Sequence, residues 1–479
     1  MSKDSLQSPK ARKLGYSSQL AFVISLIAGS VGTGNIWRFP RVAAANGGAF
    51  VLAYIIMMFI VIIPVMMGEH FMGRRSRRGA PGTFKLIAGK KATWLGTIVA
   101  FIMAMTAAYY SAVLAWIVYY VGLSFTKGYY GADKAALFAS VSNGNIVTVI
   151  LFVLILGISA YICYKGVSGI EKANKIFIPI LFVSLIVMAV RALMLPGATE
   201  GLNHYFGFQF GDLLNYKTWL EALTQAIWSA GPGWGLCITL AVFSKSRSDV
   251  TLTSAVNGLG DMFAAVLAGL ANGLTFIAMT GLVEKMPGGY LMGILFFVSL
   301  LMAGLSSNIC HFMICSLPLV DAGKDRKKSI LGVFVLLLIW GLPSAWNSTF
   351  LSNQDWVAGQ MMIVGVMFSC YAMIKFGVSK IRGTYLNNPY TGLKIGKWWE
   401  VSIRFIAPII AGIMFVWWTA QCIGWEANWW NPFGVNNLGT FVFQGGLMAI
   451  IAYAMNKKVV NATPEAVVPE GELFPAVPD

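Results

Sequence analysis

The amino-acid sequence predicts an all-α polytopic membrane protein with twelve transmembrane helices, in which helices 1–5 and 6–10 form an inverted repeat and helices 1 and 6 are broken. Three observations predict this fold. The 479-residue chain is 57% hydrophobic and only 11% charged, whereas a soluble protein of this length carries about 25% charged residues. Apolar runs of about 20 residues, long enough to cross a bilayer, recur along the chain. Two of these runs are interrupted by glycine, and one of them also by proline.

Charge-poor runs divide the chain into twelve predicted spans within residues 14–455. The preceding segment, 1–13, is polar and basic, and the first apolar run is of full spanning length, which argues against a cleavable signal peptide. The tail 456–479, with its proline, glutamate and valine residues, is predicted to be disordered. Its predicted cytoplasmic location follows from the distribution of positive charge. The spans lie near residues 14–38, 49–72, 93–124, 145–164, 173–195, 218–244, 250–283, 289–320, 329–346, 356–379, 401–424 and 436–455.

The distribution of positive charge predicts the orientation of these spans in the lipid bilayer. With a cytoplasmic N-terminus, the cytoplasmic segments carry 28 of the 35 Lys and Arg residues. This bias follows the positive-inside rule and predicts a multi-pass protein of the plasma (inner) membrane with both termini in the cytoplasm. The net charge of +16 therefore reflects topology anchors such as "GRRSRRG" (73–79) and does not predict nucleic-acid binding.

The sequence lacks the usual signatures of an enzyme. The six cysteines lie in or beside apolar runs without paired spacing, and the three histidines are scattered, so neither a disulfide framework nor a zinc site is predicted. No Walker loop, zincin helix or nucleophile elbow is present, and the glycines of "GSVGTG" follow no strand. We therefore predict that the protein is not an enzyme and has no catalytic residue.

Two spans contain segments that weaken a helix where lipid most penalises free backbone. The first holds "AGSVGTGNIWRFP" (28–40), and the sixth holds "SAGPGWG" (229–235). Each opens one half of the chain, and paired interruptions of this kind are typical of transporters built from inverted repeats. Unwinding frees carbonyls to coordinate a cation and exposes amides that attract a carboxylate. Two accidental kinks are the alternative interpretation.

Polar residues inside other spans are candidates for a buried site. Asp261 follows Thr251 by ten residues, about 15 Å along a helix and so near mid-membrane. A carboxylate there needs a partner, either a neighbouring hydroxyl, a shared proton or a hard cation such as Na⁺. Glu69 fits either an interfacial charge or a carboxylate that accepts amides from an unwound segment. Ser306 and Ser307 offer adjacent hydroxyls, which routine interhelical hydrogen bonding also explains.

The motifs resemble the neurotransmitter:sodium symporter family, of which the bacterial leucine transporter is the model. The likeness covers nearly the whole chain in order, and it implies ten core helices in two inverted five-helix repeats with two peripheral helices. The segments that carry it are "GNIWRFP", "NGGAF", "GEHFMGR", "AYYSAVLAW", "GVSGIEKANKIFIPILF", "SAGPGWG", "MAGLSS" and "DWVAG".

This resemblance implies two sodium sites. The substrate carboxylate would complete the first one. Most family members have Asn where this chain has Asp261, and the resemblance places Ala265 where chloride-dependent members have Ser. Because the Asp261 carboxylate could replace the charge of the anion, we expect transport without a chloride requirement. The first sodium would bind Ser30, Asn35, Ser229 and Asp261, and the second Ala28, Val31, Ala303, Ser306 and Ser307.

The resemblance also implies a substrate site for a molecule with its own carboxylate. Gly34 and Tyr110 would bind that group, and Gly32 stands where monoamine transporters have Asp. His311 stands where aliphatic or small residues are usual, and it is interpreted either as a core residue or as a polar handle on the substrate. The remaining residues around the substrate would be Thr33, Thr106, Trp228, Gly231, Trp234 and Ser307.

Two gates are expected from the same resemblance. Arg38 and Asp355 would close the outer side together with Tyr110 and Trp228, and Lys13 would face Asp321 on the inner side. Lys in place of the usual Arg would make a weaker, non-bidentate pair. The spacing from Gly169 to Pro179 is associated in this family with unwinding of span five.

The function expected on these grounds is sodium-coupled import of a small or medium neutral amino acid by alternating access. A non-protein zwitterion such as taurine or a betaine-like osmolyte is the first alternative cargo. A channel or sensor on the same fold is a second alternative, which the paired gates and broken helices disfavour. The expected partners are the substrate, sodium ions and the lipid bilayer, and the sequence leaves open whether the protein is a monomer or a dimer.

Overall fold

The computed structural model describes residues 15–245, 247–271, 276–465, 468, 472–475 and 477, and these residues form helices with no β-strand among them. The α-helices are α1 (Gln19–Ser30), α2 (Phe39–Met57), α3 (Ile63–Ser76), α4 (Ala80–Ala88), α5 (Thr93–Thr126), α6 (Lys134–Ser142), α7 (Ile146–Tyr164), α8 (Gly166–Leu193), α9 (Ala198–Phe206), α10 (Tyr216–Ala230), α11 (Leu236–Val242), α12 (Val250–Ala271), α13 (Phe276–Lys285), α14 (Gly289–Asp321), α15 (Arg326–Trp346), α16 (Ser348–Phe376), α17 (Val378–Lys380), α18 (Trp398–Val401), α19 (Ala407–Ile423) and α20 (Leu438–Ala462). Short π- or 3₁₀-helical segments are η2 (Gly34–Arg38), η3 (Met58–Ile62), η4 (Lys90–Ala92), η5 (Phe210–Leu214), η6 (Ile381–Leu386) and η7 (Ser402–Ile406).

Ten helical runs of the described residues are long and apolar enough to cross a membrane. The two predicted spans without a long helix of their own are spans one and six, which are the two spans predicted to be broken. Span one is divided between α1 and η2, and span six between α10 and α11. The prediction of a twelve-span helical fold is therefore confirmed.

The break in span six is formed by glycines whose backbone conformation other residues rarely adopt. After α10 ends at Ala230, Gly231, Gly233 and Gly235 have φ of 85°, 87° and 81°. In this left-handed region a side chain would clash with the backbone, so glycine is the default residue. Span one breaks more gently, because Val31 follows α1 in an extended conformation with ψ of 95°.

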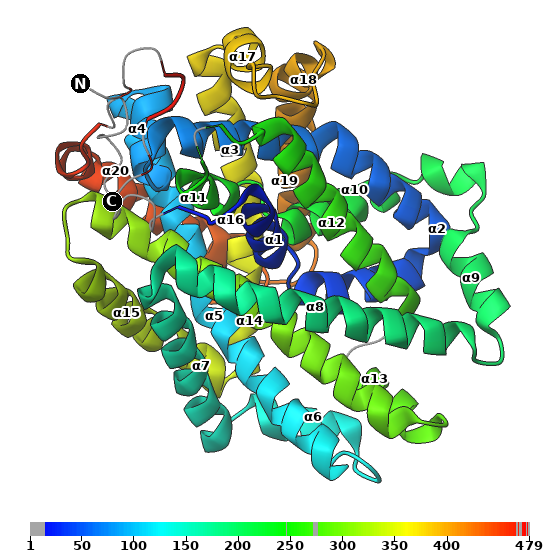
Figure 1. Ribbon diagram of the computed structural model, residues 1–479. Helices are drawn as coiled ribbons and strands as arrows, with labels where there is room; N and C mark the ends of the chain where they lie inside the picture. Colours follow the sequence, from blue (N-terminus) through cyan, green and yellow to red (C-terminus); the bar gives the residue numbers. More distant parts are fainter. Residues whose placement is uncertain are drawn as a thin grey trace.

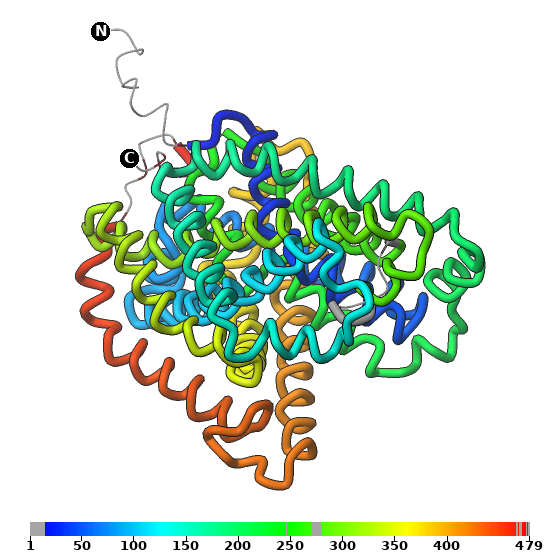
Figure 2. The backbone as a smooth tube through the Cα atoms, turned by 90° about the horizontal axis from the view of Figure 1, so that it is seen from below, coloured from blue at the N-terminus to red at the C-terminus, as the bar shows by residue number. Residues whose placement is uncertain are grey.

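The broken helices lie at the centre of the bundle. In Figure 1, α1 is surrounded by α8, α11 and α12, which also pack against it. Figure 2 shows α19 and the start of α20 projecting from the other helices. Their side chains are largely exposed, as expected for helices that would face lipid. The centre of the fold is thus the place where interrupted backbone is shielded.

Three details differ from the sequence-based expectations. The helix α20 continues to Ala462, so the tail begins later than residue 456. Part of that tail is docked and not disordered: Phe474 is only 3% exposed and lies under the Arg74 guanidinium, 4.1 Å from its ring centre. Span five is one continuous helix, α8, in which Pro179 lies within the helix.

Candidate functional site

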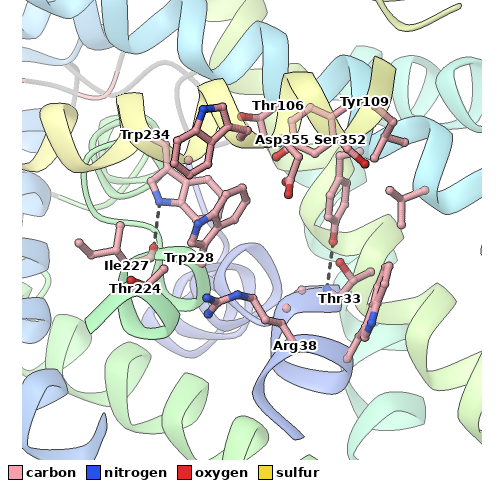
Figure 3. Close-up of a pocket in the computed structure, with 18 of the residues that line it drawn as sticks. Thr33, Arg38, Thr106, Tyr109, Thr224, Ile227, Trp228, Trp234, Ser352 and Asp355 are labelled. Carbon is pink, nitrogen blue, oxygen red and sulfur yellow. Dashed lines mark hydrogen bonds between the residues drawn. The ribbon is translucent and has the colours of Figure 1, made fainter. Parts of the chain in front are cut away.

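A cavity of about 650 Å³ lies where the two broken spans meet. It extends from the Gly29–Asn35 region past Arg38 to Trp425 and Asn436, in the connection between α19 and α20. Figure 3 shows side chains from α5, α10 and α16 around it. Of the predicted substrate residues, the cavity is lined by Thr33, Gly34, Thr106, Tyr110, Trp228, Trp234, Ser307 and His311.

Gly231 is the predicted substrate residue that does not line this cavity. A Cβ atom at this position would lie 2.8 Å from Leu236 Cδ2 and 3.6 Å from the Trp234 ring. The glycine is therefore needed for the positive φ of the break and for close packing, because the space beside it is occupied by protein.

The predicted first sodium ligands come together in a buried polar cluster. The Asn35 side-chain amide donates to Ser229 Oγ at 2.6 Å and to Asp261 Oδ1 at 2.8 Å. The Ser229 hydroxyl donates to both carboxyl oxygens of Asp261, at 3.0 and 2.8 Å. Tyr54, which the sequence did not single out, donates to Asp261 Oδ2 at 3.4 Å. The carboxyl group is thus surrounded by oxygen and amide groups on both broken spans and on α2.

Ser30 links the two breaks through its side chain. Its hydroxyl lies 3.3 Å from the carbonyl oxygen of Ala230, the last residue of α10, and 3.2 Å from Asn257 Oδ1. Asn257 lies one helical turn before Asp261 on α12 and is fully buried. Its position on the face of Asp261 is the sequence signal that could have identified it.

The predicted second sodium ligands also form one cluster. The Ser307 hydroxyl lies 3.4 Å from each of the Ala28 and Val31 carbonyl oxygens and 3.2 Å from the Ala303 carbonyl oxygen. The Ser306 hydroxyl lies 2.8 Å from the same Ala303 oxygen. Hard cations prefer oxygen ligands, and carbonyl and hydroxyl oxygens such as these are among them. The described residues contain no group of three or more His, Cys, Asp or Glu side chains that could hold a metal.

Glu69 holds the break of span six in place. Its Oε1 accepts hydrogen bonds from the Gly233 amide at 2.9 Å and the Ser369 hydroxyl at 2.6 Å. Gly365 of α16 also lies so close to the break that a Cβ atom there would overlap the Gly233 carbonyl. This geometry agrees with the second interpretation of Glu69, in which its carboxyl group accepts an amide of an unwound segment.

The floor of the cavity presents backbone and hydroxyl groups. The Thr33 amide donates to the Tyr110 hydroxyl at 3.1 Å, and the Gln225 side chain donates to the Gly34 carbonyl at 3.3 Å. A Cβ atom at Gly34 would meet nothing within 4 Å, so this backbone faces open space. Trp228 lies against Gly359, where a Cβ atom would come within 2.9 Å of the indole ring.

The expected outer gate is not paired in this structure. Arg38 and Asp355 both line the cavity, and Figure 3 shows them on opposite sides of it. The Arg38 guanidinium instead binds Glu221 at 3.3 Å and Gln225 at 2.8 Å. Sequence reasoning missed both α10 residues, although their spacing of four places them on one helix face.

On the side expected to be cytoplasmic, Asp321 accepts a hydrogen bond from the Gly79 amide at 2.6 Å and lies 4.0 Å from Arg78. Its expected partner Lys13 lies outside the described residues. Tyr16 is 2% exposed and packs against Phe22 with ring centres 5.0 Å apart. The chain is therefore tightly packed at the start of span one.

Arg77 joins the C-terminal end of span six to the tail. Its guanidinium donates to the carbonyl oxygens of Val242 and Ser244 at 2.6 and 2.7 Å, and to Pro475 at 3.0 Å. Burial lowers the pKa of this guanidinium to about 9, so it keeps its charge at neutral pH. A cation at the C-terminal end of α11 is stabilised by the helix dipole.

A family model described as the sodium:neurotransmitter symporter family matches residues 13–134, 128–272 and 271–461. An uncharacterized sodium-dependent transporter of Methanocaldococcus jannaschii is 30% identical over 441 residues, covering 82% of this chain and 88% of the relative. A sodium-dependent neutral amino acid transporter B(0)AT2 of Pongo abelii is 27% identical over 288 residues, which cover 53% of this chain and 39% of that protein. Among solved structures, MhsT in complex with L-phenylalanine matches with a TM-score of 0.73 and 26% identity, covering 84% of this chain and 99% of that chain.

Proposed function

The chain belongs to the sodium:neurotransmitter symporter family, and from this premise we propose that it imports a neutral amino acid together with sodium ions. It is a multi-pass membrane protein of a sodium-dependent family. The observation that carries the proposal is the position of the two oxygen clusters. Both touch the Ala28–Asn35 break, and the cavity is lined by the same segment.

The first sodium ion would bind the cluster of Asn35, Ser229 and Asp261 together with the Ser30 carbonyl. The hydrogen bonds that now join these side chains satisfy the carboxyl group without an ion, and a cation would replace them as its partner. A substrate carboxylate at Gly34 and Tyr110 would add a further oxygen ligand. This shared ligand would make substrate binding stronger in the presence of sodium.

The second sodium ion would bind between the Ala28 and Val31 carbonyls of span one and α14. Its hydroxyl ligands would be Ser306 and Ser307, and Ser307 also lines the cavity. An ion here would tie span one to α14 and favour the arrangement in which the cavity is open. Each sodium ion that enters contributes about 2.3 kcal/mol per 100 mV of membrane potential, besides its concentration gradient.

The cargo is proposed to be a small or medium neutral amino acid. The reason is that glycine stands at position 32, where monoamine transporters have the Asp that holds an amine. A Cβ atom there would lie 3.0 Å from the Tyr110 hydroxyl and 3.2 Å from the Ser307 hydroxyl. A carboxylate side chain at this position would therefore be crowded. The name of B(0)AT2 and the phenylalanine in MhsT support the same cargo class.

Chloride is proposed to be unnecessary. Asp261 supplies a negative charge in the first cluster, and the buried Ala265 one turn further offers no hydroxyl for an anion. Replacing external chloride with gluconate would leave uptake unchanged, and a collapse of uptake would refute this part of the proposal.

The decisive experiment is uptake of labelled amino acids by proteoliposomes in sodium and in choline medium. Sodium-stimulated accumulation of at least one neutral amino acid is expected. Taurine and glycine betaine are included because a non-protein zwitterion is the alternative cargo. Accumulation against a gradient would exclude a channel, and the absence of stimulation by sodium for every amino acid would refute the proposed function.

A further inference from the structure

His311 is a buried polar side chain on the wall of the cavity, and its ring nitrogens lack hydrogen-bond partners in the described part of the chain. It lies on α14, lines the cavity and is 1% exposed. Neither ring nitrogen has a hydrogen-bond partner among the described residues. Buried polar groups in proteins are nearly always hydrogen-bonded, so the unpaired imidazole indicates that a bound molecule supplies its hydrogen-bond partner.

The neighbouring polar groups already have partners. Trp234 Nε1 donates to the Ile227 carbonyl at 3.3 Å, as Figure 3 shows. The Thr106 hydroxyl donates to the Ile102 carbonyl at 2.8 Å, and the Tyr110 hydroxyl accepts from the Thr33 amide. In contrast to these groups, both ring nitrogens of His311 have unused hydrogen-bonding capacity.

The histidine lies where the side chain of a bound amino acid would extend. It follows Ser307 by four residues, so both lie on the same face of α14 one turn apart. Its ring is edge-on to Tyr110 with ring centres 5.1 Å apart, and it is 6.1 Å from Trp234. With the substrate carboxylate at Tyr110, the imidazole would face the substrate side chain and Trp234 would form the apolar wall beside it.

A structural or metal-binding role explains this residue less well. No cluster of three His, Cys, Asp or Glu residues that could hold a metal occurs in the described part of the chain. Burying an unpaired charge is costly, so the uncharged imidazole is the relevant form. This form offers one donor and one acceptor. In an unloaded cavity only water can satisfy them, and a substrate that displaces such water without replacing its hydrogen bonds loses affinity.

We propose that His311 selects neutral amino acids whose side chain carries a hydroxyl or carboxamide group over apolar side chains of similar shape. This inference rests on the proposed function, whose cargo class it narrows. The polar side chain hydrogen-bonds to the imidazole, whereas an apolar side chain leaves both ring nitrogens unpaired. A loss of this kind corresponds to a discrimination of about tenfold or more.

The test compares matched pairs of labelled amino acids in sodium-driven uptake by proteoliposomes. The pairs are tyrosine and phenylalanine, threonine and valine, and glutamine and methionine. In the wild-type protein the polar member of at least one pair is expected to have a kcat/KM about tenfold above its apolar partner. His311→Leu removes this preference, and His311→Gln, which keeps a donor and an acceptor, restores part of it.

His70→Leu is the matched control, because it also removes a buried imidazole. His70 does not line the cavity, and its Nδ1 already has Ser254 as a partner. This variant should leave the pair ratios unchanged. Equal or apolar-favouring uptake in every wild-type pair, or an unchanged ratio in an active His311→Leu protein, overturns the inference alone. Absence of sodium-stimulated uptake of all six amino acids overturns the proposed function as well. If His311→Leu is inactive, the wild-type ratios and His311→Gln still decide the matter.

Discussion

Removing the carboxyl group of Glu69 is expected to destabilise the protein through the broken segment of span six. In Glu69→Ala, the Gly233 amide and the Ser369 hydroxyl both lose their acceptor. Glu69 is fully buried, so water cannot readily take the place of its carboxyl group as the acceptor. Leaving a buried donor unpaired costs about 1–3 kcal/mol, which predicts a loss of about 2–6 kcal/mol for the two donors together.

Thermal unfolding of the detergent-purified protein, followed by tryptophan fluorescence, measures this effect. Glu200→Ala, a change to an exposed carboxylate on α9, is the control and should leave the melting temperature unchanged. Ser369→Ala removes one donor and should be milder. The double variant Glu69→Ala/Ser369→Ala should lose less than the sum of the two single losses, because one unpaired donor is then absent. If Glu69→Ala melts at the wild-type temperature, Glu69 does not hold the break.

Three further outcomes are expected. Asp261→Asn should lower the apparent sodium affinity of uptake several-fold, while the melting temperature in sodium-free buffer changes little. An unchanged sodium dependence of uptake would remove Asp261 from the ion site. Phe474→Ala should increase protease cleavage of the tail, because Phe474 loses its contacts with Arg74 and with Tyr385, whose ring centre is 5.7 Å away. The hydrogen bond from Lys134 holds the pKa of Glu284 below its usual value of 4.5, so Glu284→Gln should lower the melting temperature at pH 7. The ionised form supplies this stability above the unfolded-state pKa, so the difference should shrink as the pH falls through the folded-state pKa, which lies below 4.5. A difference that did not depend on pH would contradict this origin.

The elements that sequence reasoning identified are those whose causes are local. Charge-poor runs and the placement of Lys and Arg report the solvent of each segment directly. Glycines at 231, 233 and 235 permit a left-handed backbone without reference to the remaining fold. The residues of the two oxygen clusters could be named from the motif resemblance because most of them lie close to these breaks, and the structure brings them within hydrogen-bonding distance of one another.

Residues whose roles depend on distant segments could not be identified in this way. Arg38 binds Glu221 and Gln225 instead of Asp355, because its partner depends on how far α16 stands from span one. Asn257 reaches Ser30 only because α12 packs beside α1. Phe474 is buried by Arg74 and Tyr385, which are far from it in the chain and from each other.

By itself, the sequence determined that this protein crosses the membrane repeatedly, that its first and sixth spans are broken, and which residue types stand at the breaks. These properties follow from hydrophobicity, charge and backbone sterics, which act over a few residues. The tertiary structure alone decided that Gly231 faces Leu236 and not the cavity, that Glu69 supports the Gly233 amide, and that both nitrogens of His311 are left without a partner among the described residues. Such outcomes depend on which helices meet, because hydrogen bonds and close contacts between distant segments exist only after packing has set the distances.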